Sequence, residues 1–376
     1  MLSNPANNNL ANSNLANNNA LTDDGHPVQE LCRRCSFEQV AYLRWHGRLP
    51  TPDQLRGQLR AERGQRALAP DLAARVAARP GDGPLDDLRT AVSLIGAADP
   101  APGDRSPGGT RAKALRLFAL LPAVVAAGQR RRHGLEPVAP RPDLGYAANF
   151  LYMTFGKVPE PQIVRAFEVS LILYAEHSVN ATPAARVADS TAADLYGTVG
   201  AVAGSLPASA TEAVIDMMNE IGVPENARPW LDAALASGGK IPGFGHRLER
   251  SGDPRVPAMR PALGMIAALR GGQRLTGVYE ALAEAVHEAR GLRPHLDYPA
   301  GPAYHLIGLD TAAFTPVLFI ARLPGLTAHI AGQLVRQRPA QLAKPAPAAQ
   351  PAPAAQLAKP AQLAQPAQLA QPAARG

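Results

Sequence analysis

The sequence predicts a mostly α-helical protein, and three observations support this prediction. Hydrophobic residues make up 46% of the chain while aromatic residues make up only 5%, which suits an alanine-rich helical protein. Apolar residues recur at helical spacing behind recognisable helix start signals. Alternating runs of β-branched residues and Asn-Gly turn pairs, which are typical of strands and hairpins, do not occur in the sequence.

Two start signals open the folded part. Ser36-Phe37-Glu38-Gln39 is a capping box, which predicts a helix that Gly47 and Pro50 end. Thr51-Pro52-Asp53-Gln54 predicts a second helix, with proline at its first position, where the missing N–H costs nothing.

Further helices are predicted from buried faces. Leu85, Leu88, Val92 and Ile95 follow one another at three- and four-residue spacing, as on one face of a helix. The remaining predicted helices are Arg111–Ala127, one that starts at Pro159-Glu160-Pro161 and runs toward His177, Ala210–Ile221, Ala227–Ala236, Pro257–Leu269, Gly277–Ala289, Gly301–Ile307 and Thr315–Val335. Gly238–Gly245 and Gly291–Asp297 are predicted loops, where ligand-binding groups tend to lie.

Both ends of the chain differ from its middle. Residues 1–24 are rich in asparagine, and residues 339–376 repeat variants of Pro-Ala-Gln-Leu-Ala. Neither segment can bury enough apolar surface to offset the entropy lost on ordering, so we expect both to be disordered tails. Residues 25–338 are long enough for one large domain, or for a large and a smaller one.

The net charge and the apolar segments bear on the cellular compartment and on whether nucleic acid or a membrane is a partner. The net charge is +7, but the basic residues are mostly scattered along predicted helices, so we expect no nucleic-acid partner. The run from Gln129 to His133 is either a solvated helix end or a contact for ligand phosphates. The apolar run Leu115–Ala127 is too short to span a bilayer, and no secretory signal precedes the folded part. We therefore expect a cytoplasmic protein without a membrane partner.

The only cysteines, Cys32 and Cys35, form a C-x-x-C pair. A zinc site needs a second pair of ligands at suitable spacing, and the sequence offers none. Chance spacing and a redox pair remain the two interpretations. We expect no metal.

A glycine-rich loop is the most informative motif. Gly243-Phe244-Gly245-His246-Arg247 is followed by Gly252-Asp253-Pro254-Arg255. The glycines allow tight turns and a close backbone approach to a ligand, while one imidazole and two guanidiniums reach the same space. This pattern predicts a site for a small anion with a polarisable carbonyl, although glycine turns beside a histidine are also common in ordinary loops.

Further ionisable residues stand at helix–loop junctions. His177, Asp297 and Arg322 each have a structural explanation when taken alone, as a cap, a turn residue and a solvated surface residue. In this order, however, they join the glycine-rich loop in a recognisable pattern.

From Gly25 to Val335 the sequence resembles the citrate synthase family. The stretch Asp297-Tyr298-Pro299-Ala300-Gly301-Pro302-Ala303-Tyr304 looks more like actinobacterial 2-methylcitrate synthases than ordinary citrate synthases. The segments that carry the family resemblance are Cys35–Leu43, Glu176-His177 with Asn180-Ala181, the motif from Gly243 to Arg255, the loop at Asp297, Phe314-Thr315-Pro316 and Thr327-Ala328-His329-Ile330.

The resemblance implies a large helical domain, residues 25–207 with 303–338, and a smaller helical domain, residues 208–302, with the active site in the cleft between them. It also implies a homodimer that joins an acyl-CoA to oxaloacetate and hydrolyses the thioester, without metal or cofactor. The implied roles are Asp297 as the base, His246 to polarise the oxaloacetate carbonyl, His177, Arg255 and Arg322 to hold its carboxylates, and Lys240, Gly243, Phe244 and Gly245 to lie against CoA. The Arg130–Arg132 cluster is a further candidate for CoA phosphates.

The sequence departs from the family at a second catalytic histidine. Pro207 stands where that histidine is expected, and Ala208 and Ser209 replace the two glycines after it. The family uses this histidine to stabilise the enol, so activity is expected to be lowered. The alternative is a catalytically inactive relative that binds oxaloacetate or CoA, or pairs with an intact subunit. The arginine that the family sends to the partner subunit's site cannot be assigned to Arg336-Gln337-Arg338-Pro339.

Overall fold

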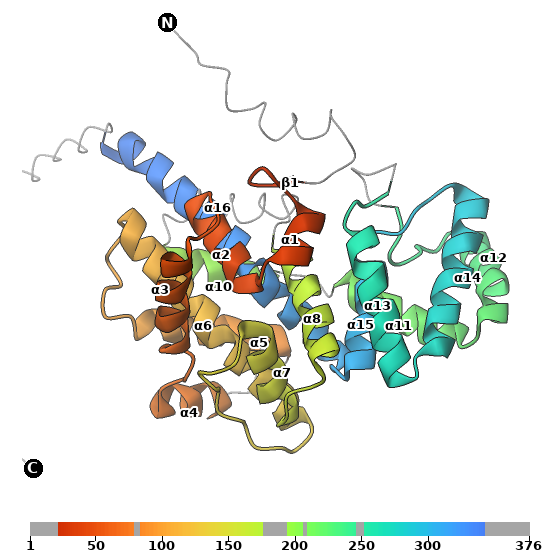
Figure 1. Ribbon diagram of the computed structural model, residues 1–376, viewed down its shortest axis with the longest axis horizontal. Coiled ribbons are helices and arrows are strands. Elements are labelled where there is room, and N and C mark those ends of the chain that lie inside the picture. The colour runs from red at the N-terminus through yellow and green to blue at the C-terminus, as the bar shows by residue number, and fades with distance from the viewer. Residues whose placement is uncertain (1–21, 79–82, 176–193, 206–208, 246–251, 343–376) are drawn as a thin grey trace, which may run out of the picture. The chain divides into compact units, whose positions relative to one another are not determined.

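Helices make up nearly all of the regular structure in the computed structural model, which describes residues 22–78, 83–175, 194–205, 209–245 and 252–342 (Figure 1). Within these ranges the only strands are β1 (Thr22–Asp23) and β2 (His26–Pro27), which pair antiparallel. The prediction of a mostly α fold is therefore confirmed. The described residues up to Arg336 form one compact unit.

The helices follow the order of the chain, and their labels are those of Figure 1. The first group is α1 (Val28–Arg34), α2 (Phe37–His46), α3 (Pro52–Arg63), α4 (Pro70–Ala78), α5 (Pro84–Ala97), α6 (Pro107–Arg132), α7 (Tyr146–Phe155), α8 (Pro161–Tyr174) and α10 (Leu195–Ser205). The second group is α11 (Ala210–Ile221), η3 (Pro224–Asn226), α12 (Ala227–Ala236), α13 (Val256–Arg270), α14 (Gln273–Arg290), α15 (Asp297–Ile307), η4 (Thr311–Ala313) and α16 (Phe314–Leu342).

Both predicted capping boxes form. At α2 the Ser36 hydroxyl accepts a hydrogen bond from the Gln39 backbone N–H, and the Gln39 side chain accepts one from the Ser36 N–H. Thr51 and Gln54 repeat the arrangement at α3, each pair satisfying two backbone donors that the first turn leaves without partners. Gly47 ends α2 with a φ of 68°.

Several helix boundaries differ from the predicted ones: α14 begins at Gln273 and not at Gly277, α16 continues past Val335, and the starts of α6 and α15 also lie earlier than predicted. Helix α6 begins at Pro107 because the Ser106 hydroxyl caps the Gly109 N–H at 3.0 Å, one turn ahead of the first periodic apolar residue. Helix α15 begins at Asp297 itself, so this carboxylate lies in the first helical turn and not in the preceding loop.

The core of the first group surrounds α6, which contacts α3, α5, α7 and α10. Its Phe118 ring stacks on Tyr146 at 4.3 Å between centroids and lies 5.4 Å from Phe37. The apolar run Leu115–Ala127 was expected to be too short to cross a membrane, but the helix that contains it, α6, is long and apolar enough, as are residues 311–334. In each of them 72% of the most apolar stretch is buried inside the protein. Buried core helices have this property too, and the absence of a membrane partner stays a prediction.

Two helices of the second group, α13 and α15, pack against α8 of the first, and α16 reaches α2 through the hydrogen bond from Trp45 to Thr327. Helices α13 and α15 contact each other and α8, while α11 contacts α14 and α15 (Figure 1). Helix α15 approaches α11 so closely that a Cβ on Gly301 would lie 2.7 Å from the Thr211 carbonyl oxygen. This packing brings the end of α8 to the start of α15. The predicted domain division at residues 208 and 302 stays a prediction.

The predicted tails lie largely outside the described residues. Where they overlap, Thr22–Asp23 pairs with His26–Pro27, and α16 continues to Leu342.

Candidate active site

Asp297 forms the centre of a polar cluster at the start of α15. Its Oδ1 accepts a 2.5 Å hydrogen bond from the Tyr174 hydroxyl at the end of α8. Its Oδ2 lies 3.3 Å from Nδ1 of His295. Burial alone would raise the pKa of Asp297, but the hydrogen bonds from His295 and Tyr174 and the charges of His295 and Arg322 outweigh it, and the pKa falls to about 2. The carboxylate is therefore charged at neutral pH.

Arg322 of α16 supplies the facing positive charge. Its guanidinium carbon lies 5.5 Å from the centroid of the Tyr174 ring, within the range of a cation–π contact. Among the described residues its buried Nε has no hydrogen-bond partner. Burial lowers the pKa of Arg322, while the negative charge of Asp297 opposes this shift. A buried guanidinium with an unused donor fits an anionic ligand.

Arg255 lies at the start of α13 and is held by Asp253. The Arg255 Nε and Nη2 donate to the two carboxylate oxygens at 2.9 and 2.7 Å, and both side chains are buried, with 6% and 0% of their surfaces exposed. Asp253 Oδ2 also accepts the backbone N–H of Leu296 at 2.9 Å. Burial would raise the pKa of Asp253, but the hydrogen bonds and charge of Arg255 lower it overall. Asp253 thus connects Arg255 to the residue before Asp297.

The glycine-rich loop runs beside the same segment. Gly243 accepts the His295 N–H through its carbonyl oxygen at 2.9 Å, and Phe244 forms an antiparallel bridge with Pro294. The Phe244 ring packs on Tyr298 at 4.5 Å between centroids. Gly243 has a φ of +86°, and a Cβ there would lie 2.7 Å from Cδ2 of Tyr298. Only glycine suits both the backbone conformation and the space.

These contacts bring together several of the residues that the sequence singled out. Asp297 and Arg322 share Tyr174, Arg255 is joined to Leu296 through Asp253, and Gly243 and Phe244 flank the loop before Asp297. Lys240 and Gly245 are exposed near the ends of the predicted loop. His177 and His246 lie outside the described residues, as does Pro207.

Three residues of the cluster had no predicted role. Tyr174 precedes His177 by three positions, Asp253 precedes Arg255 by two, and His295 precedes Asp297 by two. Their proximity to the recognised motifs was a signal that could have identified them. Their contacts depend on how distant segments pack, which local sequence does not reveal.

The basic cluster at the end of α6 is engaged within the protein. Arg131 pairs with Asp87 at 3.0 Å, and Arg132 and His133 contact Asp310 at 3.2 and 2.7 Å. Arg130 donates to the backbone carbonyls of Glu136 and Thr154. These contacts favour the structural interpretation of this cluster over phosphate binding.

The two cysteines are free thiols in the core. Burial raises the pKa of Cys32 to about 12 and also raises that of Cys35. Because the thiolate is the reactive form, these thiols are poorly suited to redox chemistry. Among the described residues no three His, Cys, Asp or Glu side chains gather as a metal site.

Comparison with known proteins gives a consistent result. The family model described as the citrate synthase C-terminal domain matches residues 6–346. A 2-methylcitrate synthase of Mycobacterium tuberculosis is 50% identical over 320 residues, 84% of this chain and 81% of the relative. A citrate synthase of Mycolicibacterium smegmatis is 49% identical over 84% of this chain and 85% of its own. The crystal structure of citrate synthase from Pyrobaculum aerophilum superposes with a TM-score of 0.79 at 31% identity, covering 91% and 89% of the two chains.

The fold and the matches define a helical protein of the class that joins acyl-CoA to a keto acid. The chain belongs to the citrate synthase family, whose members condense an acyl-CoA with oxaloacetate. The predicted resemblance to actinobacterial 2-methylcitrate synthases and citrate synthases is confirmed. The large and small helical domain fold is confirmed at the level of the family.

Proposed function

We propose that this protein condenses propionyl-CoA or acetyl-CoA with oxaloacetate to give 2-methylcitrate or citrate. The observation that carries the proposal is that the charged Asp297 carboxylate and the buried guanidinium of Arg322 both contact one tyrosine, Tyr174. A weakly acidic C–H group needs a carboxylate base in a site that excludes water. A dicarboxylic keto acid needs guanidinium groups to bind it, and arginine suits a carboxylate better than lysine does.

In the proposed reaction Asp297 removes a proton from the carbon α to the thioester carbonyl. The resulting enolate attacks the oxaloacetate carbonyl carbon, the C=O π bond opens as the new carbon–carbon bond forms, and the oxygen that His246 polarises takes up a proton. Water then cleaves the thioester and CoA leaves as the free thiol. His177, Arg255 and Arg322 hold the oxaloacetate carboxylates, and Lys240, Gly243, Phe244 and Gly245 lie against CoA. In this proposal the reaction uses no metal or cofactor, and acyl-CoA is a substrate.

The residue at position 207 supports a lowered rate. The family's enol-stabilising donor is a histidine, and a proline side chain has no donor with which to replace it. Loss of one such donor costs about 10²- to 10³-fold in rate. The same observation supports the second candidate, an inactive relative that binds oxaloacetate or CoA, or serves as a regulatory partner subunit. We further propose a cytoplasmic homodimer.

Release of free thiol separates the two candidates. The purified protein is mixed with oxaloacetate and either acetyl-CoA or propionyl-CoA, and CoA release is followed with a thiol reagent. Release above background that is lost in Asp297→Ala and kept in Glu280→Ala supports the enzyme. Oxaloacetate binding by calorimetry without thiol release supports the binding-only relative.

Restoring the donor is a further test. Pro207→His is expected to raise turnover if the missing imidazole limits the rate. If turnover rises only when Ala208 and Ser209 also become glycine, the backbone of that segment matters as much as the imidazole.

A further inference from the structure

Tyr174 contacts two residues of the candidate site, Asp297 and Arg322. It is the last residue of α8, and its side chain is buried, with 1% of the residue exposed. Its hydroxyl donates to Oδ1 of Asp297 at 2.5 Å, and its ring faces the guanidinium of Arg322 at 5.5 Å. Burial and the neighbouring Asp297 raise the pKa of Tyr174 well above its ordinary value, so its hydroxyl stays protonated and keeps donating.

Packing between α8 and its neighbouring helices keeps the Tyr174 side chain in place. Helix α8 packs against α13 and α15, and the Tyr304 hydroxyl of α15 lies 3.1 Å from the Ser170 hydroxyl, one turn before Tyr174. The Phe167 and Tyr304 rings also meet at 6.1 Å between centroids. A packed tyrosine has two side-chain torsions, so a rotation that released Asp297 would also move the ring away from Arg322.

We propose that Tyr174 is a positioning residue that fixes the base Asp297 through its hydroxyl and the anion-binding Arg322 through its ring, so that one side chain sets the relation between them. The roles of Asp297 and Arg322 rest on the proposed function, whereas the two contacts of Tyr174 do not. Each carboxylate oxygen of Asp297 has a second lone pair, so the hydrogen bond orients the base without consuming its capacity to accept a proton.

The contribution of the Tyr174 hydroxyl can be recognised from the pKa of Asp297. The groups that face the carboxylate are Tyr174 from α8, His295 from the preceding loop, Arg322 from α16 and, at longer range, Tyr304 from α15. Removing the Tyr174 hydroxyl leaves burial in place but takes away one donor, so the pKa of Asp297 rises from about 2 toward its ordinary value. A purely structural hydroxyl would not change this titration.

Three variants separate the two contacts. Tyr174→Phe removes the hydroxyl and keeps the ring, while Tyr174→Leu removes both. Tyr304→Phe is the matched control, because it removes a buried hydroxyl that also joins α8 to α15 but that donates to Ser170 and not to Asp297.

The first measurement is thermal unfolding of the full chain as a function of pH, which requires no turnover. A depressed folded-state pKa stabilises the protein above the unfolded pKa of about 4 and loses that contribution as pH falls through the folded value. The difference in melting temperature between wild type and Tyr174→Phe should therefore shrink by about half between pH 7 and pH 3. The difference for Tyr304→Phe should stay constant. A pH-independent difference for Tyr174→Phe would overturn the proposal.

The second measurement is oxaloacetate binding by calorimetry. Tyr174→Phe should bind within about twofold of wild type, and Tyr174→Leu should bind roughly 3- to 30-fold more weakly because the cation–π contact is lost. Where turnover is measurable, Tyr174→Phe should lower kcat while KM for oxaloacetate changes little. Equal binding by Tyr174→Leu and wild type would refute the role of the ring. If the difference in melting temperature between wild type and Tyr174→Phe depends on pH but no thiol is released, the contacts of Tyr174 are supported and the catalytic role of Asp297 is rejected.

Discussion

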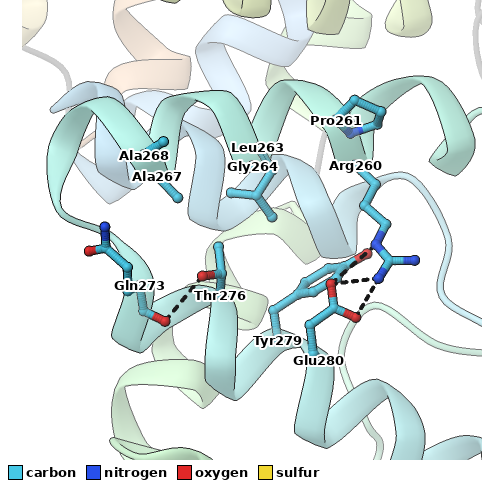
Figure 2. A pocket seen from close by; sticks show the side chains of 10 residues that line it. All are labelled: Arg260, Pro261, Leu263, Gly264, Ala267, Ala268, Gln273, Thr276, Tyr279 and Glu280. Atoms are coloured by element: carbon cyan, nitrogen blue, oxygen red, sulfur yellow. Dashed lines mark hydrogen bonds and ion pairs between the residues drawn. The ribbon is translucent and has the colours of Figure 1, made fainter.

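Two arginine–carboxylate pairs near the start of α13 have similar geometry in different surroundings. Arg255 binds Asp253 through Nε and Nη2, and Arg260 binds Glu280 through the same two atoms at 3.1 and 2.8 Å. The first pair is buried, whereas the side chains of the second are 60% and 53% exposed. Figure 2 shows the second pair at one end of a pocket between α13 and α14.

The difference lies in what each carboxylate does besides pairing. Asp253 also accepts two backbone N–H groups, those of Arg255 and Leu296, so it fixes two loops of the candidate site. Glu280 lines the pocket, and its carboxylate accepts hydrogen bonds from Arg260 (Figure 2). The Arg255–Asp253 pair therefore holds the candidate site together, whereas the Arg260–Glu280 pair, with similar geometry, lies on a solvated helix surface.

The largest expected effect is on turnover. Asp297→Ala should lower the rate of thiol release by about 10²- to 10⁴-fold, because the proposed base is lost. Arg260→Ala, in the pocket of Figure 2, should leave the rate within about twofold. Steady-state assays of both variants check this. Equal losses would place the pocket in the reaction and contradict the contrast between the two regions.

The next largest effect is on the free energy of unfolding, which should fall more when the buried ion pair is broken than when the exposed one is. Asp253→Ala leaves the buried Arg255 without its carboxylate, which should cost about 3–5 kcal/mol of unfolding free energy. Glu280→Ala removes an exposed partner and should cost about 0–1 kcal/mol. Urea unfolding at neutral pH measures both. Similar values for the two variants would show that burial does not distinguish the pairs.

The Asp253 effect should also depend on pH. Because the folded-state pKa of Asp253 is lowered, its ion pair stabilises the protein above the unfolded pKa of about 4, and this contribution is lost as pH falls through the folded value. The gap between wild type and Asp253→Asn should therefore narrow below about pH 4. Urea midpoints at several pH values test this, and a constant gap would argue against a charged carboxylate.

A pair of glycines gives the smallest effects, with opposite signs. Gly243→Ala should destabilise the protein by about 1–3 kcal/mol, because its φ of +86° and the nearby Tyr298 ring both oppose a side chain. Gly264 lies inside α13 and lines the pocket, and a Cβ there would meet nothing within 4 Å. Gly264→Ala should therefore stabilise by roughly 0.5–1 kcal/mol. Thermal unfolding checks both signs.

Local signals predicted the helices well because their causes are local. The capping boxes at Ser36 and Thr51 depend on residues three positions apart, and both form as predicted. The start of α6 was placed too late because the capping serine and the first proline precede the apolar pattern.

The site could be predicted only in part. Motif residues such as Asp297 and Arg322 were recognisable from the family resemblance, and the structure brings them to one tyrosine. The Tyr174–Asp297 contact joins residues 123 positions apart, and the Asp253–Leu296 contact joins residues 43 positions apart. Such pairs depend on how α8, α13 and α15 pack, so no local pattern reveals them. The same holds for Arg131, whose partner Asp87 lies on another helix.

The hydrogen bond from the Leu296 N–H to Asp253 closes the chain on itself at the base of α13 and α14. The intervening residues, 254–295, leave and return at nearly the same point. A rigid-body rotation of α13 and α14 about this point during substrate entry would leave Arg255 and Asp297 close to the rotation axis. The distance between the two residues would then change little. The proposed base and this proposed substrate-binding arginine would therefore keep their spacing throughout such a motion.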